Sequence, residues 1–163
     1  MKKAYTYLAV RSLLGDLTAV YEDGILCFLG FGEKAAKEAA ATWPEATYED
    51  NHKVLWSLLS RLEDRAALGN LPLGGTPFQR EVWVQLTKIP CGTVTTYQYI
   101  ANQIGRPKAV RAVANAIGRN PISVFIPCHR VIGSDGKLHG YRWGVEIKEK
   151  LLARERESAQ NAY

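Results

Sequence analysis

Short β-prone runs alternate with turn residues at the start of the chain. Residues 17–31, LTAVYEDGILCFLGF, contain two runs rich in β-branched, aromatic and leucine side chains, separated by Asp23-Gly24. This dipeptide suits the positive φ angles of a tight hairpin turn. We therefore predict a β-hairpin here, with Cys27 as an inert core side chain of its second strand.

Helical periodicity follows the hairpin. Residues 33–43 are rich in alanine, and residues 51–64 repeat valine and leucine at helical spacing. Glycine and proline are then concentrated in residues 69–75, a composition typical of a linker or turn. The pattern predicts a small α/β domain over residues 1–72 and a second domain over residues 73–163.

The second half opens with helix signals. Thr76-Pro77-Phe78-Gln79 combines an N-cap, a first-turn proline and the glutamine of a capping box. Residues 93–121 indicate two short helices joined by a tight turn, with Gly105 ending the first helix and Pro107 opening the second. An apolar face and a polar face are predicted for the second helix, formed respectively by Val110, Val113 and Ile117 and by Lys108, Arg111 and Asn115. Such a pair fits DNA docking, and it equally fits a helix turn that never contacts DNA.

Composition narrows the possibilities. The 163 residues are 47% hydrophobic and 23% charged, which is ordinary for a globular protein, and no apolar run approaches the roughly 20 residues of a membrane span. The three cysteines form no C-x-x-C pair, so we expect reduced thiols in a cytoplasmic protein, with no disulfide framework and no metal site. A net charge of +5 is compatible with a polyanionic partner without proving one.

One thiol stands out chemically. Residues 122–126 are β-branched and aromatic, which predicts a buried strand that delivers Cys128 just after Pro127. A thiol with an ordinary pKa of about 8.5 needs a basic or positive neighbour to react at neutral pH, and His129 and Arg130 follow directly. Neighbours in an extended segment point in opposite directions, so a structural cysteine and a nucleophile both remain open.

Glu155 is a candidate third member of this group. It continues the helical line of Ile147 and Leu151 in the C-terminal segment. Its carboxylate is either a solvated helix end or a partly buried group that orients His129, and the spacing alone leaves both open.

Several segments together closely resemble the O6-alkylguanine-DNA alkyltransferase family. They are GTPFQ at residues 75–79, TYQYIANQIGRPKAVRAVANAIGRNP at residues 96–121, IPCHRV at residues 126–131, GYRWG at residues 140–144 and KEKLL at residues 148–152. The resemblance covers the second half of the chain. It implies an α/β plus α fold: an N-terminal RNase H-like α/β domain, then a mostly helical, winged-helix-like domain with a helix-turn-helix.

The resemblance also implies roles for individual residues. Cys128 would accept the alkyl group, with His129 bridging to the thiol through water, Glu155 orienting His129, Asn120 holding the active-site loop, and Tyr97 moving a phosphate and protonating the base at N3. Arg111 would fill the space that the flipped base leaves. The implied DNA contacts are Tyr97, Lys108, Ala109, Val110, Arg111, Ala114, Asn115 and Arg130. The implied base pocket consists of Val131, Tyr141, Arg142 and Trp143, with the carbonyls of Cys128 and Val131 and the amide of Arg142 contacting the base.

The implied function is direct repair of duplex DNA from the minor groove. A single-turnover methyltransferase would move a methyl group from O6-methylguanine, and from O4-methylthymine, irreversibly to Cys128 without a cofactor, acting as a monomer away from membranes. The bulk of Arg142-Trp143 predicts a preference for methyl over benzyl. Without a cysteine-rich zinc domain, no transcriptional switch is expected. The alternatives are an alkyltransferase-like lesion-binding protein, which Cys128 disfavours, a helix-turn-helix transcription factor and a cysteine hydrolase.

Overall fold

The computed structural model describes residues 2–50 and 73–161, with side chains as far as residue 159. The chain divides into two compact units: Met1–Leu73 with Pro121–Phe125, and Gly74–Asn120 with Ile126–Tyr163. The return of Pro121–Phe125 to the first unit is a feature that the predicted domain ranges lack. The helix predicted over residues 51–64, and most of the predicted linker, lie outside the described residues.

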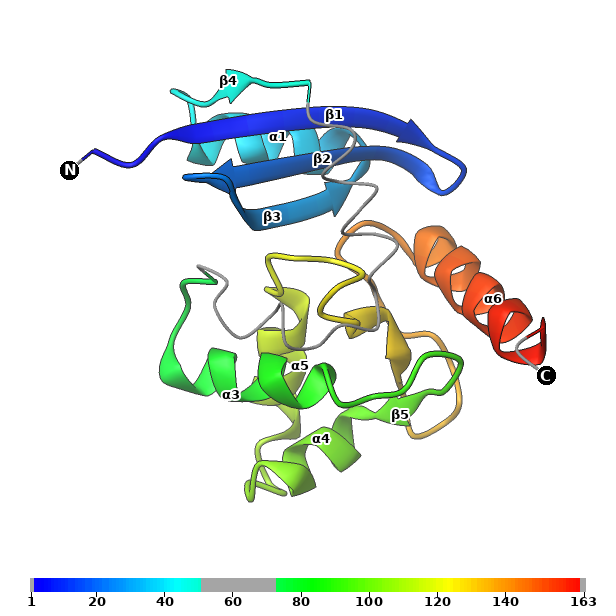
Figure 1. Ribbon diagram of the computed structural model, residues 1–163. Helices are drawn as coiled ribbons and strands as arrows, with labels where there is room; N and C mark the ends of the chain where they lie inside the picture. The colour runs from blue at the N-terminus through cyan, green and yellow to red at the C-terminus, as the bar shows by residue number, and fades with distance from the viewer. Residues whose placement is uncertain (1, 51–72, 162–163) are drawn as a thin grey trace. The chain divides into compact units, whose positions relative to one another are not determined.

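A small sheet forms the centre of the first unit, with strand order β3-β2-β1-β4. Its elements are β1 (Tyr5–Ser12), β2 (Gly15–Glu22), β3 (Ile25–Phe31), the helix α1 (Gly32–Thr42) and β4 (Thr47–Tyr48). β1, β2 and β3 are antiparallel neighbours, and β4 pairs parallel with β1. Figure 1 shows α1 lying along one face of this sheet.

The predicted hairpin is confirmed as β2 and β3. Asp23 and Gly24 form its turn with φ angles of 49° and 82°. Cys27 is buried in β3, where burial raises its pKa to about 12, in keeping with an inert thiol. β1 was not predicted, because its side chains alternate only weakly between buried and exposed positions.

The strand predicted over residues 122–126 is wrong. Only Ile122 forms a β-bridge, with Leu29 of β3, and Val124 then adopts a positive φ of 74° that turns the chain. An apolar run predicts burial but not the kind of element. Here the run is buried as a turn, which is held by backbone hydrogen bonds of Pro121 and Ser123 with Leu29.

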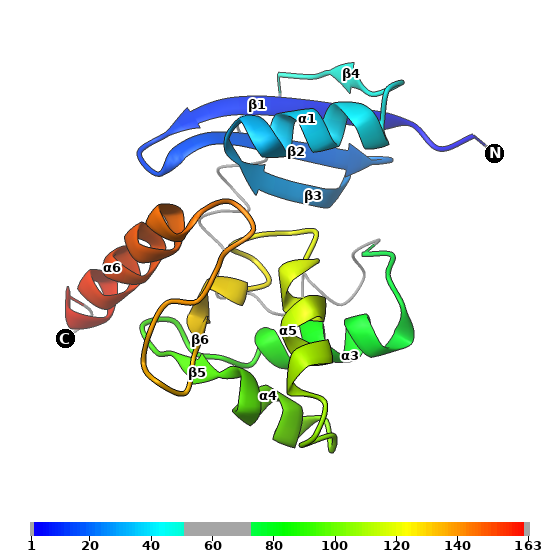
Figure 2. The ribbon, with the colours of Figure 1, turned by 180° about the vertical axis from the view of Figure 1, so that it is seen from behind.

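The second unit is mostly helical. Its elements are α3 (Pro77–Leu86), β5 (Thr95–Thr96), α4 (Tyr97–Gln103), α5 (Val110–Gly118), the 3-10 turn η2 (Cys128–Arg130), β6 (Val131–Ile132) and α6 (Val145–Asn161). Figure 2 shows α3, α4 and α5 packed together and β5 beside β6, with which it pairs in parallel. The capping box is confirmed, since Thr76 and Gln79 exchange side-chain to backbone hydrogen bonds of 2.9 and 3.1 Å.

The helix-turn-helix is confirmed with one correction. α4 ends before Gly105, whose φ is 71°, as predicted. Pro107 does not open the second helix: Arg106 to Ala109 form a turn closed by a 2.9 Å backbone hydrogen bond, and α5 begins at Val110. The two predicted faces are largely confirmed: Val113 and Ile117 are buried, whereas Val110 is only partly buried. Lys108, Arg111 and Asn115 are exposed, with Lys108 just before the helix, and we call these three residues the α5 polar face.

Candidate functional site

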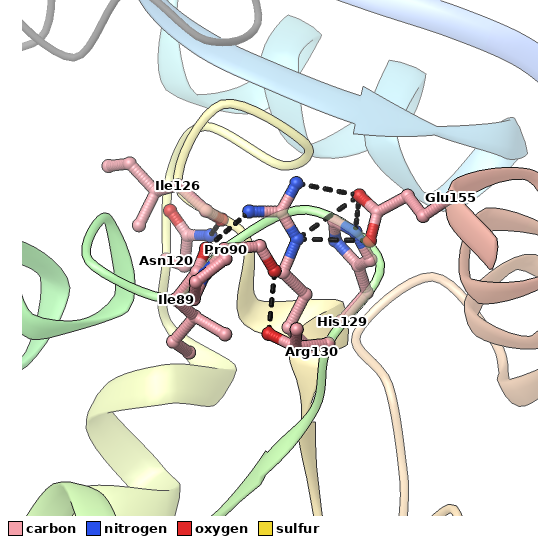
Figure 3. Close-up of polar contacts among 8 residues, drawn as sticks. Ile89, Pro90, Asn120, Ile126, His129, Arg130 and Glu155 are labelled. Atoms are coloured by element: carbon pink, nitrogen blue, oxygen red, sulfur yellow. Dashed lines mark hydrogen bonds and ion pairs between the residues drawn. The ribbon is translucent and has the colours of Figure 1, made fainter. Parts of the chain in front are cut away.

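The thiol of Cys128 lies at the first residue of η2, and a side chain of the second unit holds the backbone before it. Pro127 is the N-cap of this turn. The Asn120 side-chain amide donates a 2.6 Å hydrogen bond to the carbonyl of Ile126, as Figure 3 shows. Because Asn120 is itself buried, this bond fixes the path of the chain into Cys128.

The thiol is buried, and its surroundings act on it in opposite directions. Burial is the largest influence and raises the pKa of Cys128. Hydrogen bonds from Asn120 and Tyr141 and the positive charge of Lys148 lower the pKa. Donors and a cation therefore already surround the atom on which negative charge would develop.

His129 and Glu155 meet, although they are far apart in sequence. The ring nitrogen Nε2 of His129 lies 2.6 Å from Oε1 of Glu155. A carboxylate on Nε2 favours the tautomer that carries its proton there, which leaves the Nδ1 lone pair as the basic position. Among the described residues, this buried Nδ1 has no hydrogen-bond partner. Glu155 is thus a partly buried group facing His129 and not a solvated helix end.

These contacts change the acid–base behaviour of the pair. Burial lowers the pKa of His129 and outweighs the opposite effect of Glu155. Burial raises the pKa of Glu155, but hydrogen bonds from His129 and Arg130 outweigh it and bring that pKa down to about 2. The resting state at neutral pH is therefore an ionised carboxylate beside a neutral imidazole.

Arg130 is placed differently from what the sequence analysis expected of a DNA contact. It is buried, and its guanidinium donates to both carboxylate oxygens of Glu155 and to the carbonyl of Ile89 (Figure 3). Nothing in the sequence between residues 89 and 155 signalled that these groups would meet.

Lys148 was missed as a site residue. It is only 1% exposed, and its ammonium lies 3.3 Å from the carbonyls of His139 and Gly140. The hydroxyl of Tyr97 donates to the same His139 carbonyl, also at 3.3 Å. A signal was available, because Lys148 lies on the helical stripe of Leu151, Leu152 and Glu155 that faces inward.

The predicted pocket residues come from two segments, β6 and the residues just before α6. Val131 is fully buried in β6. The Arg142 side chain donates a 2.9 Å hydrogen bond to the Asn120 carbonyl and stacks over Trp143, with 4.7 Å from its central carbon to the ring centroid. The Tyr141 hydroxyl acts on the thiol by lowering the pKa of Cys128. The predicted pocket residues Tyr141 and Arg142 thus converge on Cys128 and Asn120.

The predicted DNA contacts, other than Arg130, are accessible. Lys108, Arg111 and Asn115 are exposed, and Ala109, Val110 and Ala114 are partly exposed around the start of α5. Tyr97 begins α4 and is half-buried, and burial together with the nearby Cys128 raises its pKa.

Other kinds of site find no support in the part of the chain that the structure describes. Within residues 2–50 and 73–161, no group of at least three His, Cys, Asp and Glu side chains is arranged to hold a metal ion. The described helices include none with the length and apolar character needed to cross a bilayer.

Comparison with known proteins agrees with this geometry. The family described as "6-O-methylguanine DNA methyltransferase, DNA binding domain" matches residues 77–157. The O6-methylguanine methyltransferase of Mycobacterium tuberculosis has a crystal structure that matches with a TM-score of 0.76 and 35% identity, over 94% of this chain and 93% of that one. The chain belongs to the O6-methylguanine-DNA methyltransferase family.

Curated relatives extend the comparison. The bifunctional transcriptional activator/DNA repair enzyme Ada of Escherichia coli is 50% identical over 171 aligned residues, 94% of this chain and 47% of its own length. A methylated-DNA--protein-cysteine methyltransferase of Salmonella typhimurium is 61% identical over 82 residues, 50% of this chain and 48% of its own length. The chain thus spans about half the length of the curated relatives that it matches.

Family membership bears on both units. All of the predicted site residues, from Tyr97 to Glu155, fall within the range 77–157 that matches the methyltransferase family. The sequence resemblance was confined to the second half, whereas the structural match covers nearly the whole chain. The mixed α/β character of the structure agrees with the predicted fold class, and the RNase H-like and winged-helix-like descriptions of the units stay predictions.

Proposed function

We propose that this chain repairs duplex DNA by moving the alkyl group of O6-alkylguanine, methyl in particular, to the sulfur of Cys128. The main support for this proposal is the buried thiol of Cys128 in the same unit as the helix-turn-helix. His129 follows it directly, and Glu155 lies 2.6 Å from Nε2 of that histidine. A relative that is 35% identical, from Mycobacterium tuberculosis, has been crystallised in complex with DNA, which supports DNA as the partner.

Proton transfer starts the reaction. Glu155 keeps the proton of the neutral imidazole on Nε2, so Nδ1 of His129 accepts the Cys128 proton, through a water molecule as the resemblance implies. The thiolate then attacks the alkyl carbon in line with the C–O6 bond. The S–C bond forms as the C–O6 bond breaks, and its electron pair goes to the guanine.

Tyr97 protonates the departing base at N3 in this scheme. Its hydroxyl now donates to the His139 carbonyl over 3.3 Å, a long hydrogen bond that can be exchanged for a stronger one to a base. The proton gained by His129 and the proton lost by Tyr97 are afterwards balanced by exchange with solvent.

Base flipping follows from where the thiol lies. Cys128 is only 6% exposed, so a base that remains stacked in a duplex cannot reach it. The α5 polar face enters the minor groove, and the exposed guanidinium of Arg111 takes the place of the extruded base. Tyr97 displaces the adjoining phosphate.

The pocket favours small alkyl groups. The carbonyls of Cys128 and Val131 and the amide of Arg142 recognise the base. The stack of Arg142 on Trp143, tied to the Asn120 carbonyl, narrows the wall beside the alkyl carbon. Methyl is therefore preferred over benzyl, and O4-methylthymine is a further substrate.

The product is a thioether, and it ends the cycle. A carbon–sulfur bond of this kind offers water no acyl carbon and no good leaving group, so each molecule acts once, inside the cell. A hydrolase using the same thiol would instead turn over repeatedly.

The mass of the intact protein tests the proposal. After incubation with duplex DNA containing O6-methylguanine, each active molecule is expected to carry one methyl group, mapped by peptide analysis to Cys128 rather than to Cys27 or Cys91. The same duplex with unmodified guanine is the control. An unchanged mass contradicts alkyl transfer, and released product with repeated turnover favours a hydrolase.

Two further measurements separate binding from chemistry. Cys128→Ala is expected to lose transfer completely while it still binds the lesion duplex. Duplexes with O6-benzylguanine and O4-methylthymine test the substrate range, and equal rates for benzyl and methyl contradict the narrow pocket.

A further inference from the structure

The guanidinium of Arg130 lies inside the second unit, close to the reacting groups. Its Nε and Nη2 donate to the Glu155 carboxylate at 3.0 and 2.8 Å, and its Nη1 donates to the Ile89 carbonyl at 2.7 Å (Figure 3). The residue is only 8% exposed. Each of the three nitrogens thus donates to an acceptor within the protein, and the burial of the side chain keeps it from a DNA phosphate.

Arg130 and His129 share one carboxylate. Oε1 of Glu155 accepts from Nη2 of Arg130 at 2.8 Å and lies 2.6 Å from Nε2 of His129. A guanidinium that binds both oxygens of a carboxylate fixes the carboxylate plane. The orientation of the imidazole therefore depends on Arg130 as well as on Glu155.

The same arginine ties three segments together. Ile89 precedes a turn in which Gly92 has a φ of 82° and lies so close to α6 that an added Cβ would be 2.8 Å from the Ala159 Cβ. This turn therefore packs on the same helix that carries Glu155. Arg130, in η2, joins the turn through Ile89 and α6 through Glu155.

Charge gives this arrangement a chemical consequence. The charged groups that act on His129 are Glu155 and Lys148 of α6 and Arg130 of η2. An ionised Glu155 without Arg130 would attract a proton to the imidazole. With Arg130 bound, the carboxylate is already compensated, and burial keeps the ring neutral.

We propose that Arg130 is a positioning residue that shares the Glu155 carboxylate with His129, holding the imidazole neutral and oriented with Nδ1 ready to accept the Cys128 proton. This role takes the place of the DNA contact expected for Arg130, and it rests on the proposed alkyl transfer. Arg130 touches neither the base nor the alkyl group in this scheme.

The test follows His129 directly in the full chain. In Arg130→Met, NMR titration without DNA is expected to show His129 protonated up to a higher pH than in the parent. Single-turnover transfer near pH 6.5 is expected to fall about tenfold, and the deficit is expected to shrink to about threefold or less near pH 8.5. Arg156→Met, which removes an exposed arginine next to Glu155 in α6, is the matched control and is expected to change neither curve.

A second variant covers the case in which Arg130→Met does not fold. Arg130→Lys keeps the charge and loses the planar fork, so His129 is expected to titrate as in the parent while transfer slows by a similar factor at every pH. A change in the His129 titration of Arg130→Lys as large as that expected for Arg130→Met contradicts the proposal.

Two outcomes overturn the inference. One is an unaltered His129 titration in folded Arg130→Met. The other is a loss of affinity for undamaged duplex, with a salt dependence reduced by about one ion and an unchanged pH profile, which identifies a phosphate contact. Because the His129 titration needs no substrate, it separates a failure of this role from a failure of alkyl transfer itself.

Discussion

Two arginines of the second unit carry the same side chain in opposite surroundings. Arg130 is buried, and its guanidinium is bonded to Glu155 and to a backbone carbonyl. Arg111 is exposed on the α5 polar face. Two lysines of the same unit repeat the contrast: Lys148 is 1% exposed and its charge lowers the pKa of Cys128, whereas Lys108 is exposed just before α5.

The contrast shows why residue type alone does not assign a function to a basic side chain. A buried cation must be compensated within the protein, so its effects appear in the folding and in the chemistry of neighbouring groups. An exposed cation is hydrated and available to a partner, so its effects appear in binding and depend on salt. Changes to the first group should therefore alter the protein without DNA, and changes to the second group should not.

The largest effect is expected from removing the negative charge of Glu155, which binds both Arg130 and His129. Glu155→Gln leaves Arg130 buried without its carboxylate, and this change is expected to lower the free energy of unfolding by about 3–5 kcal/mol. Transfer should fall by at least about a hundredfold, because an amide can donate to His129 Nε2 and select the wrong tautomer. Urea unfolding and single-turnover kinetics measure the two effects. Glu157→Gln, an exposed carboxylate on the same helix, is the control, and equal losses in both variants contradict the contrast.

The sequence predicted the local features of the fold better than the contacts between distant segments. The capping box, the hairpin turn at Asp23-Gly24 and the faces of α5 depend on residues a few positions apart, where spacing determines geometry. The contact of Arg130 with Glu155 spans 25 positions and depends on how α6 packs. No local pattern specifies such packing, so Arg130 was expected on DNA. Lys148 was overlooked although its place on the inward-facing stripe of α6 could be read from the sequence.

The errors within the fold have the same origin. The apolar run over residues 122–126 correctly indicated burial, but burial is compatible with a turn as well as with a strand. Pro107 fits a first helical turn by its own chemistry, yet the chain closes a turn between Arg106 and Ala109 before α5 begins. In the first case contacts with β3 overrode the local preference for a strand. In the second case the turn between Arg106 and Ala109 overrode the local preference of Pro107 for a helix start.

Acid should also destabilise the folded chain, because Glu155 and His129 bind protons less readily in the folded than in the unfolded chain. The pKa of Glu155 is about 2 in the folded chain against an ordinary 4.5, so the unfolded chain binds the proton more readily. This contribution, about 3 kcal/mol, is present above pH 4.5 and is lost as the pH falls towards 2. The lowered pKa of His129 acts in the same direction, beginning below its ordinary value of 6.5. Urea midpoints between neutral pH and about pH 3 measure the loss, and an acid dependence in Glu155→Gln as steep as the parent's contradicts it.

Arg111→Ala should affect only the reaction on DNA. In the proposed mechanism the Arg111 guanidinium replaces the extruded base. Without it, transfer from O6-methylguanine in duplex DNA is expected to slow by about 10–100-fold, a loss comparable to the cost of unstacking a base. Alkylation of Cys128 by the free base O6-methylguanine, and the unfolding midpoint, are expected to match the parent. Arg119→Ala, another exposed arginine of this unit, is the control. An equal slowing with free base and duplex would place Arg111 in the chemistry instead.

Among the buried cations, Lys148 is expected to have a smaller effect, on the reactivity of the Cys128 thiol. Lys148→Met removes a charge that lowers the pKa of Cys128, so the thiol pKa should rise and alkylation by iodoacetamide near pH 7.5 should slow by about three- to tenfold. Duplex affinity should stay as in the parent, because the ammonium is buried. Lys150→Met on the exposed side of α6 is the control. Loss of duplex affinity with unchanged thiol reactivity would assign Lys148 to the DNA surface.

The smallest effect is expected from the exposed lysine. Lys108→Ala removes one candidate phosphate contact next to α5, and in the counterion-release description its loss weakens duplex binding by about two- to fivefold for every sequence and lowers the salt dependence by about one ion. Thiol reactivity and stability should not change, because this side chain is exposed and its charge is not needed to compensate a buried group. Binding isotherms at several salt concentrations, with Lys88→Ala as the control, measure the slope. If Lys108→Ala alters the His129 titration while leaving the slope intact, exposure and burial no longer separate binding from chemistry in this unit.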